Sequence, residues 1–464
     1  MGLVKTNLDM VGVLQVFGMN QEVNAHGRCW LEGIVADGCK DDFVKENNSQ
    51  KRVTVTVGET TVFAGVINQI SVYQDGNVYK FKILLNTCSI LMDLKKKKRS
   101  FQNKNMTYKD LVQEIVGAYD GGDVIDNLSE GKETGTLLVQ YDETDWEFLT
   151  RLASRFNGSI LPAGEFSAPK LFFGAVKEKH MGELGQHSYS MEKTLLQYKK
   201  WNENGYSDYM ESDSLMFKVE SREYYEVGSG VMYHNAQLYI GKMEAELVKG
   251  EVIFRYELRT KQGMGQQKRY ADRLSGASIE GEVLESVKDK IKVKLEIDET
   301  QDVGTAWEFP YQTMYTADGQ GGWYCMPEKG DRVMIYFPSG TEADAAGSSS
   351  SRNLETNKRT ESPQIKFFRT IYGKEIRFTE DAVEIICSDR DSGKVKSRVV
   401  LHQDRGIELF SKDKISISSG KGIRLEAEDE IELLASDMIR LHCKKSRIQM
   451  DSMIDIAGPD VRIN

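Results

Sequence analysis

The residues best suited to chemistry are carboxylates beside an aromatic ring in the segment QYDETDWEFLTRLASRFNGSI (140–160). An acidic pair near an aromatic side chain is what a glycoside hydrolase uses, and three carboxylates here flank Trp146: Glu143, Asp145 and Glu147. The same positions also suit the first turn of a helix, where acids favour the positive end of the helix dipole. We favour this structural interpretation, because Arg151 and Arg155 lie near the end of the same segment.

The other residue types that could catalyse a reaction or bind a metal are scattered. No two of the six histidines have metal-ligand spacing, and the six cysteines form no Cys-x-x-Cys motif, so we expect reduced, structural cysteines. The sequence also lacks GxxxxGK[ST], HExxH, GxSxG and a strand-linked GxGxxG. We therefore expect no catalytic residues, no metal site, no cofactor and no enzyme activity.

Two helices must position the segments that carry these side chains. The first should begin after Thr107, a good N-cap, and bury one apolar face: Leu111, Val112, Ile115 and Val116. The second should begin after Asp142 or Thr144, either of which could cap it, and end at Asn157-Gly158. Its apolar face consists of Trp146, Leu149, Leu152, Ala153 and Phe156.

Composition excludes further classes of function. A net charge of −10 argues against a nucleic-acid-binding protein, and the basic run 95–99 is better explained as a strand end or an interface patch. The first residues lack the apolar segment that a signal peptide requires. No apolar run approaches the 18 residues expected of a membrane-spanning helix. We therefore expect synthesis in the cytoplasm, so that any extracellular role would require release or ejection. Forty-one glycines against seven prolines indicate a β-rich chain with many turns.

The last hundred residues repeat every eight positions. From Gly406 the chain reads GIELFSKD, KISISSGK, GIRLEAED, EIELLASD and MIRLHCKK. Each unit carries an apolar pair two residues apart, and period-two alternation places both members on one face of a short strand. These pairs are Ile407/Leu409, Ile415/Ile417, Ile423/Leu425, Ile431/Leu433 and Ile439/Leu441. Less regular pairs continue the pattern on both sides: Ile376/Phe378, Val383/Ile385, Val399/Leu401, Ile448/Met450, Ile454/Ile456 and Val461/Ile463.

A strand this short cannot bury its own apolar face, so neighbouring units must stabilise it. One chain could wind a solenoid with three octads per turn. Alternatively, three chains could each supply one octad per level around a common triangular core. The repeat alone leaves both arrangements open, and it disfavours an ordinary antiparallel sheet, because such sheets do not hold an unbroken eight-residue period over five units.

The rest of the chain divides by pattern into β-rich blocks. Residues 1–140 and 141–270 are expected to form two domains of short strands with the two helices. Residues 277–338 have the length and strand count of an OB-fold barrel. The polar, Ser-rich stretch 339–363 predicts a flexible linker, and 364–464 the repetitive domain.

The order of these parts resembles the hub–spike proteins of contractile phage tails and phage-tail-like bacteriocins, the late-control protein D family, and the related VgrG proteins of type VI secretion. LMDLKKKKRSFQNKNMTYKDLVQEI (91–115) is similar to the family segment in which Arg-Ser-Phe-Gln precedes a helix. The hub motif of the family matches Gln140, Tyr141, Glu143, Thr144, Asp145 and Trp146. Its OB-domain motif matches Gly322, Pro327, Glu328, Gly330 and Asp331.

The resemblance implies a mainly β fold: hub β-barrel domains with a few helices, an OB-fold barrel, and a C-terminal intertwined trimeric triple-stranded β-helix. It implies a homotrimer in which the ten octad residues, Ile407 to Leu441, form the needle core. The hub would bind the tail tube or a tube initiator and baseplate proteins. The needle would meet the target cell envelope, with a possible separate tip protein at its apex. We expect no lysozyme-like domain between barrel and needle and no effector domain after the repeats. The resemblance also implies assembly into a tail or tail-like particle that is released by lysis.

Two alternatives to a phage or bacteriocin spike stay open. The first is the spike of a type VI secretion system, which shares the same parts. The second is a receptor-binding tail fibre or trimeric adhesin, which also uses β-helical repeats but needs an exposed ligand-binding module.

Overall fold

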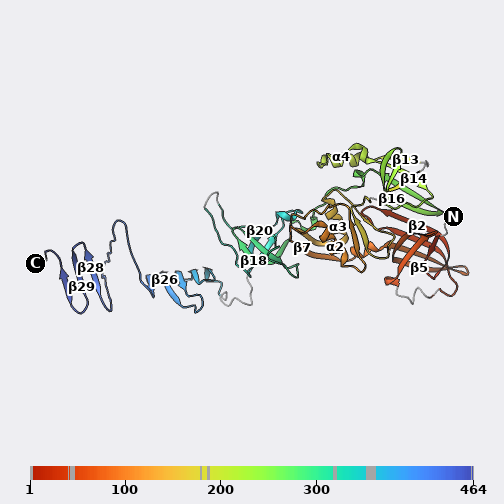
Figure 1. Cartoon of the computed structure of the whole chain (residues 1–464). Helices are drawn as coiled ribbons and strands as arrows, with labels where there is room; N and C mark the ends of the chain where they lie inside the picture. The colour runs from red at the N-terminus through yellow and green to blue at the C-terminus, as the bar shows by residue number, and fades with distance from the viewer. Residues whose placement is uncertain are drawn as a thin grey trace. The chain divides into compact units, whose positions relative to one another are not determined.

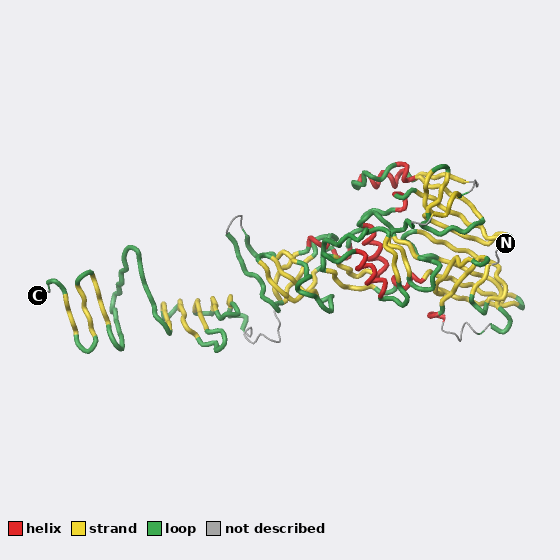
Figure 2. Tube along the Cα trace, viewed as in Figure 1, coloured by secondary structure: helices red, strands yellow, loops and turns green. Residues whose placement is uncertain are grey.

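The computed structural model describes residues 4–39, 41, 48–177, 180–184, 189–316, 321–351, 362–460 and 462. The chain divides into two compact units, Met1–Asn353 and Leu354–Asn464. Both are built mainly from strands, which confirms the expected fold class (Figures 1 and 2).

The first unit is organised around a twelve-stranded sheet with the main strand order β1-β4-β5-β6-β3-β2-β16-β17-β14-β13, to which β15 and β12 are added beside β16. Its strands from the first part of the chain are β1 Val4–Thr6, β2 Val11–Glu22, β3 Arg28–Val35, β4 Arg52–Val57, β5 Thr60–Asp75 and β6 Val78–Thr87. Those from the later part are β12 His180–Glu183, β13 Tyr189–Lys193, β14 Leu215–Ser221, β15 Gly230–Tyr233, β16 Ala236–Val248 and β17 Glu251–Arg259.

This sheet corrects the predicted boundary between residues 140 and 141. Strand β2 pairs with β16, so that Met19 lies opposite Ala245, and Figure 1 shows the two strands side by side. Side chains from both parts of the chain, such as Phe17 and Tyr256, share one hydrophobic core. The sequence could not reveal this, because alternation marks a strand without naming its partner.

A second, smaller layer contains the two predicted helices. Helix α2 (Tyr108–Gly117) begins after Thr107, whose side chain accepts a hydrogen bond from the Asp110 amide, and its four predicted apolar residues are buried. Helix α3 (Asp145–Ser154) packs in the same core. Two small sheets complete the layer: β10 Ile160–Pro162, β11 Lys170–Phe173 and β8 Asp123–Asp126 in one, β7 Lys96–Phe101 and β9 Leu138–Thr144 in the other.

Residues 278–351 form a five-stranded barrel with strand order β20-β19-β18-β21-β22. Its strands are β18 Ser278–Val287, β19 Lys290–Leu295, β20 Glu308–Pro310, β21 Arg332–Tyr336 and β22 Ala346–Ser351. The Gln312 amide donates to the Gly347 carbonyl oxygen at 2.7 Å, which joins the segment after β20 to β22 and closes the sheet. This matches the size expected of an OB-like block.

The prediction of a flexible linker over residues 339–363 is wrong for the first part of this range. Residues Ala346–Ser351 pair with β21 as a full strand, although their side chains are nearly all serine. Backbone hydrogen bonds suffice for an edge strand, so a polar composition did not exclude one. Residues 352–361 of the predicted linker lie outside the described part of the chain.

Short elements connect these blocks. Helix α4 (Leu195–Glu203) lies between β13 and β14. The 3-10 turns are η1 Asn48–Gln50, η2 Cys88–Asp93, η3 Glu211–Ser214, η4 Gln262–Met264, η5 Asp272–Leu274 and η6 Glu342–Asp344.

The second unit contains two antiparallel sheets. The first consists of β23 Lys366–Arg369, β24 Lys374–Phe378, β25 Ala382–Ser388, β26 Val395–His402 and β27 Gly406–Ser411, in sequence order. The second consists of β28 Ile439–Cys443, β29 Ser446–Met450 and β30 Ile454–Ala457. Residues 412–438, which contain the three central octads, are described but carry no strand in the single chain (Figure 2).

Candidate functional site

The two sequence motifs of the first unit meet in one two-stranded ribbon. Strand β7 carries the first three residues of Arg-Ser-Phe-Gln and pairs antiparallel with β9, which carries the hub motif as far as Thr144, so that Arg99 lies opposite Gln140. The pairing register shifts between Lys97 and Lys98, near Asp142 on the partner strand. Asp142 has a φ of 55°, in the left-handed region, as is typical of such an irregularity. We call this pair, Lys96–Phe101 with Leu138–Thr144, the motif ribbon.

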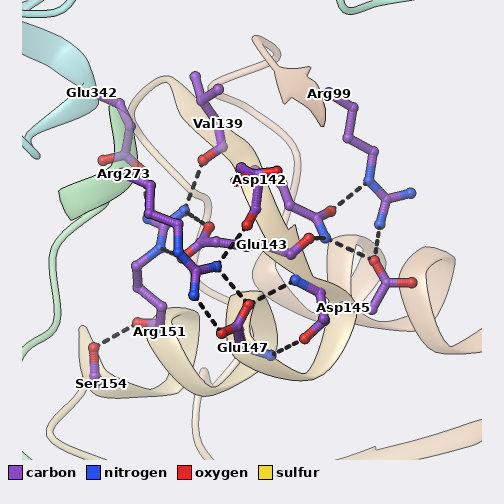
Figure 3. A network of polar contacts seen from close by, with 12 residues as sticks. Arg99, Val139, Asp142, Glu143, Asp145, Glu147, Arg151, Ser154, Arg273 and Glu342 are labelled. Atoms are coloured by element: carbon purple, nitrogen blue, oxygen red, sulfur yellow. Dashed lines mark hydrogen bonds and ion pairs between the residues drawn. The ribbon is translucent and has the colours of Figure 1, made fainter. Parts of the chain in front are cut away.

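Asp145 is the centre of the polar contacts at the ribbon (Figure 3). Its buried carboxylate accepts hydrogen bonds from Lys97 Nζ at 2.6 Å, Arg99 Nη2 at 2.9 Å and Tyr119 Oη at 2.7 Å. The Gln140 side-chain amide adds a fourth at 2.9 Å, and its own oxygen accepts from Arg99 Nε. Burial raises the pKa of the Asp145 carboxyl, but these hydrogen bonds and the charge of Arg99 outweigh it, so the pKa lies below its usual value.

We expect Asp145→Asn to destabilise the first unit at neutral pH by about 3–5 kcal/mol, because it leaves two cations beside a neutral amide. Since the folded-state pKa is depressed, the carboxylate's contribution is present above the unfolded pKa of about 3.9 and is lost as the pH falls through the folded pKa. Thermal melts of wild type and variant should therefore differ strongly at pH 7 and converge on acidification below pH 4. A constant difference down to pH 2 would contradict this assignment.

Thr144 begins helix α3 and resolves the choice between the two predicted N-caps. Its side chain accepts from the Glu147 amide at 3.1 Å, while the Glu147 carboxylate accepts from the Thr144 amide at 2.9 Å, a reciprocal capping box. The Thr144 hydroxyl also donates to Asp93 at 2.5 Å. Two residues further on, Trp146 is buried, and its ring centroid lies 4.2 Å from that of the His26 imidazole.

Arg151 has a role that the sequence did not indicate. Its side chain is only 2% exposed, although a basic residue in the last turn of a helix normally lies in solvent. Nε and Nη2 contact the two oxygens of Glu143 at 2.9 and 2.7 Å, and Nη1 donates to Glu342 at 2.6 Å (Figure 3). The predicted place of Arg151 near the end of the helix is confirmed, whereas its burial between two carboxylates was not predicted. The one sign in the sequence that Arg151 is buried was that its neighbours along the chain are mostly apolar.

The three carboxylates that flank Trp146 are all paired with cations. Glu143 pairs with Arg151, Asp145 with Lys97 and Arg99, and Glu147 with Arg273. A glycosidase acid must instead be protonated and free to donate to a substrate. Among the described residues, no group of three His, Cys, Asp or Glu side chains could hold a metal ion. The arrangement fixes the ribbon and α3 in place, and Tyr141 contributes by packing under Lys98 Nζ at 4.6 Å.

The OB motif forms the turn that leads into β21. The Asp331 carboxylate accepts from the Glu328 amide at 2.8 Å, and the Asp331 amide donates back to the Glu328 carbonyl oxygen at 3.0 Å. Gly330 has a φ of 91°, which favours glycine, and Pro327 is buried with its carbonyl oxygen bonded to Ser286. Gly322 lies apart from this turn and bridges to Thr316.

The apolar pairs of the second unit form two rows on one face of its first sheet. Cross-strand partners share a face, so the register defines the rows directly. The first row is Phe368, Ile376, Ile385, Val399 and Leu409, and the second is Phe378, Val383, Leu401 and Ile407. The opposite face carries ion pairs, with Glu375 between Arg369 at 2.6 Å and Arg377 at 2.7 Å. We call the apolar side the strip.

The octads and the second sheet carry further apolar pairs, which we include in the strip, and many of them are exposed in the single chain. The second sheet repeats the two rows as Ile439, Met450, Ile454 and Leu441, Ile448, Ile456. The six central octad residues, Ile415, Ile417, Ile423, Leu425, Ile431 and Leu433, are between 53% and 71% exposed. Val461 and Ile463 lie outside the described residues. So large a continuous apolar surface indicates that another surface covers it.

Comparisons with known proteins agree with this organisation. Residues 36–156 match the sequence model of the phage tail baseplate hub family (GPD). No curated protein sequence matches the chain. Within its described part, no helix is long and apolar enough to cross a bilayer.

Two solved structures share the fold at low sequence identity. The Escherichia coli c3393 protein, a type VI secretion component described as similar to the T4 tail proteins gp27 and gp5, has a TM-score of 0.55 at 12% identity. That match covers 75% of this chain and 100% of the other. A chain of the half-lidded Francisella PdpA–VgrG complex has a TM-score of 0.53 at 11% identity, covering 86% of this chain and 83% of the other.

Proposed function

Since residues 36–156 carry a phage tail baseplate hub domain and the chain has the fold of a hub–spike protein, we propose that it is the trimeric baseplate hub and membrane-piercing spike of a contractile injection system. The system is a phage tail or a tail-like bacteriocin. The role is structural and mechanical, without catalysis. The hub binds a tail tube or tube initiator and baseplate proteins.

The observation that carries this proposal is the exposed strip. A single chain wound as a solenoid would cover its own octads, yet Ile417 and Leu425 are 70% and 71% exposed. Three copies around one axis would bury the strip of each copy against the other two. The charged face, with Arg369, Glu375 and Arg377, would then remain outside, where ion pairs are stable.

The backbone of the central octads supports the same arrangement. Residues 412–438 have no strand partner in the single chain, although their sequence alternates as strands do. Backbone amides and carbonyls at a packed core require hydrogen-bond partners. Neighbouring copies would supply these partners, so that the needle has no open strand edge and resists unfolding under force.

A type VI secretion spike is the second candidate. Both structures with a TM-score above 0.5 described above come from such systems or include VgrG. The hub family match favours the phage or bacteriocin tail instead. Electron microscopy of particles that contain the protein separates these candidates, because a phage or bacteriocin is released as a free tail. If the protein were found in a thin fibre or at the cell surface, that would instead support a receptor-binding fibre or adhesin.

The trimer is tested by measuring mass in solution. Three chains of 52.5 kDa give 3 × 52.5, or about 157 kDa. Light scattering at micromolar concentration should report this mass and little monomer, because the strip is covered only in the assembly. A stable monomer of 52.5 kDa would overturn the intertwined needle.

The proposal also includes contacts at the two ends of the assembly. The needle meets the target cell envelope, and a separate tip protein caps its apex. The apex residues 463–464 lie outside the described part of the chain. The net charge of −10 does not favour binding to nucleic acid.

A further inference from the structure

One strand of the motif ribbon belongs to two hydrophobic cores at once. Along β9 and the residue before it, Leu138 packs with helices α2 and α3, while Leu137 and Val139 pack in the core of the barrel. Alternating side chains of a strand point to opposite faces, so the ribbon is a shared wall between the two blocks. Here the hub body means the twelve-stranded sheet together with the α2 and α3 layer.

Strand β7 divides its side chains in the same way. Phe101 stacks on Phe148 of the hub body, with ring centroids 5.7 Å apart. Ser100, on the other face, donates to both oxygens of Asp298 in the barrel, from its amide at 2.6 Å and its hydroxyl at 2.5 Å. Gln102 beyond the strand donates to the Val293 carbonyl oxygen at 3.1 Å. The Arg-Ser-Phe-Gln motif thus holds the barrel as well as the hub body.

A buried cluster of four charges connects the same two blocks. Glu342, in the turn η6 of the barrel, is 3% exposed and accepts from Arg151 at 2.6 Å and from Arg155 at 2.7 Å, both on or beside α3. Glu143 also pairs with Arg151, so the two positive charges of the cluster are neutralised by two negative charges. A third contact joins Arg273, at the entry to the barrel, to Glu147 at 2.7 and 2.8 Å.

From this arrangement we propose that the motif ribbon and the Arg151–Glu342 cluster lock the hub body and the barrel into one rigid body. Through this joint, and not through the connecting residues 261–277, axial force passes from the hub to the needle. The second statement rests on the proposed function, whereas the first concerns the isolated protein. Separating the blocks would leave buried charges without partners, so the joint opens only at high cost.

The test is Glu342→Gln in the full-length protein, with Glu308→Gln as its matched control. Glu308 lies in the same barrel and loses the same charge, but its pair with Lys290 is half exposed and 3.5 Å long. We expect calorimetry of Glu342→Gln to show a separate barrel transition, or a drop in Tm of roughly 5 °C or more, while the control stays within about 1 °C of wild type. Protease cleavage within 261–277 should accelerate about tenfold or more in Glu342→Gln alone.

Two further measurements keep the outcome decisive. If Glu342→Gln does not fold, Glu147→Gln, which removes the charge paired with Arg273 and leaves the sequence of 261–277 unchanged, should still accelerate cleavage there relative to the control. In assembled particles, Glu342→Gln should leave contraction intact and reduce killing at least tenfold. A wild-type monomer would defeat the proposed function without affecting the calorimetric test. The proposed joint would be overturned if trimeric Glu342→Gln showed the same melting, the same cleavage rate and the same killing as the control.

Discussion

Replacing Ile431 by Asp is expected to remove the trimer at micromolar concentration. The substitution places three carboxylates at one level of the proposed needle core, where each costs on the order of several kcal/mol or must become protonated. Three-fold symmetry brings these like charges together, so their repulsion adds to the cost. Light scattering should show loss of the 157 kDa species, three times 52.5 kDa, and resistance to SDS should disappear with it.

The neighbouring Glu432→Lys is the control for this experiment. Residue 432 alternates with 431 along the predicted strand, so its side chain should face solvent in the trimer. A charge reversal at such a position should change stability by no more than about 0.5 kcal/mol. Equal losses of trimer in the two variants would show that the inward and outward assignments are wrong.

The local features of the fold were predictable because they depend on neighbours in sequence. Thr107 was identified as an N-cap from one residue type before an apolar helical pattern, and the structure confirms it. Period-two alternation predicted that the apolar pairs of the second unit share one face, and the register agrees, joining Ile376 to Ile385 and Leu401 to Ile407. The pairing is antiparallel, however, an arrangement that the repeat had disfavoured. Strand alternation fixes which residues share a face, whatever the partner strand is.

The long-range features were not predictable from one sequence. Arg151 could be predicted only as a basic residue near a helix end, because its partner Glu342 lies 191 positions away. The pairing of β2 with β16 likewise joins segments separated by more than 200 residues. A buried charge or a strand edge is stable only with its partner present, and periodicity says nothing about which distant segment supplies it.

The hub motif contains both a local feature that was predictable and long-range contacts that were not. Its position at a helix start was clear from Thr144 and the acidic first turn, and Thr144 is indeed the N-cap. Asp145, however, was interpreted as a partner of the helix dipole, whereas it accepts four hydrogen bonds, from Lys97, Arg99, Tyr119 and Gln140. The basic run 95–99 and the motif were each visible in the sequence, but only the ribbon register brings them together.

Removing the needle is expected to separate assembly from piercing. The chain should be cut after Ser351, because an earlier cut would shorten β22, which pairs with β21 and completes the barrel. All three hydrophobic cores of the first unit lie before this point, so residues 1–351 should fold and melt like the first unit of the full-length protein. Light scattering may be combined with calorimetry to measure how far trimerisation weakens when the strip is absent.

In particles, the truncated protein should occupy the baseplate and permit contraction, yet killing or infection should fall by several orders of magnitude. The proposed hub contacts lie in the first unit, whereas the apolar strip that forms the proposed needle lies wholly within the second. Particles with full-length protein carrying Glu432→Lys serve as the control, since that change leaves the needle in place. Full killing by particles without the octads would show that piercing does not depend on them, and the function would then have to reside in the hub and barrel.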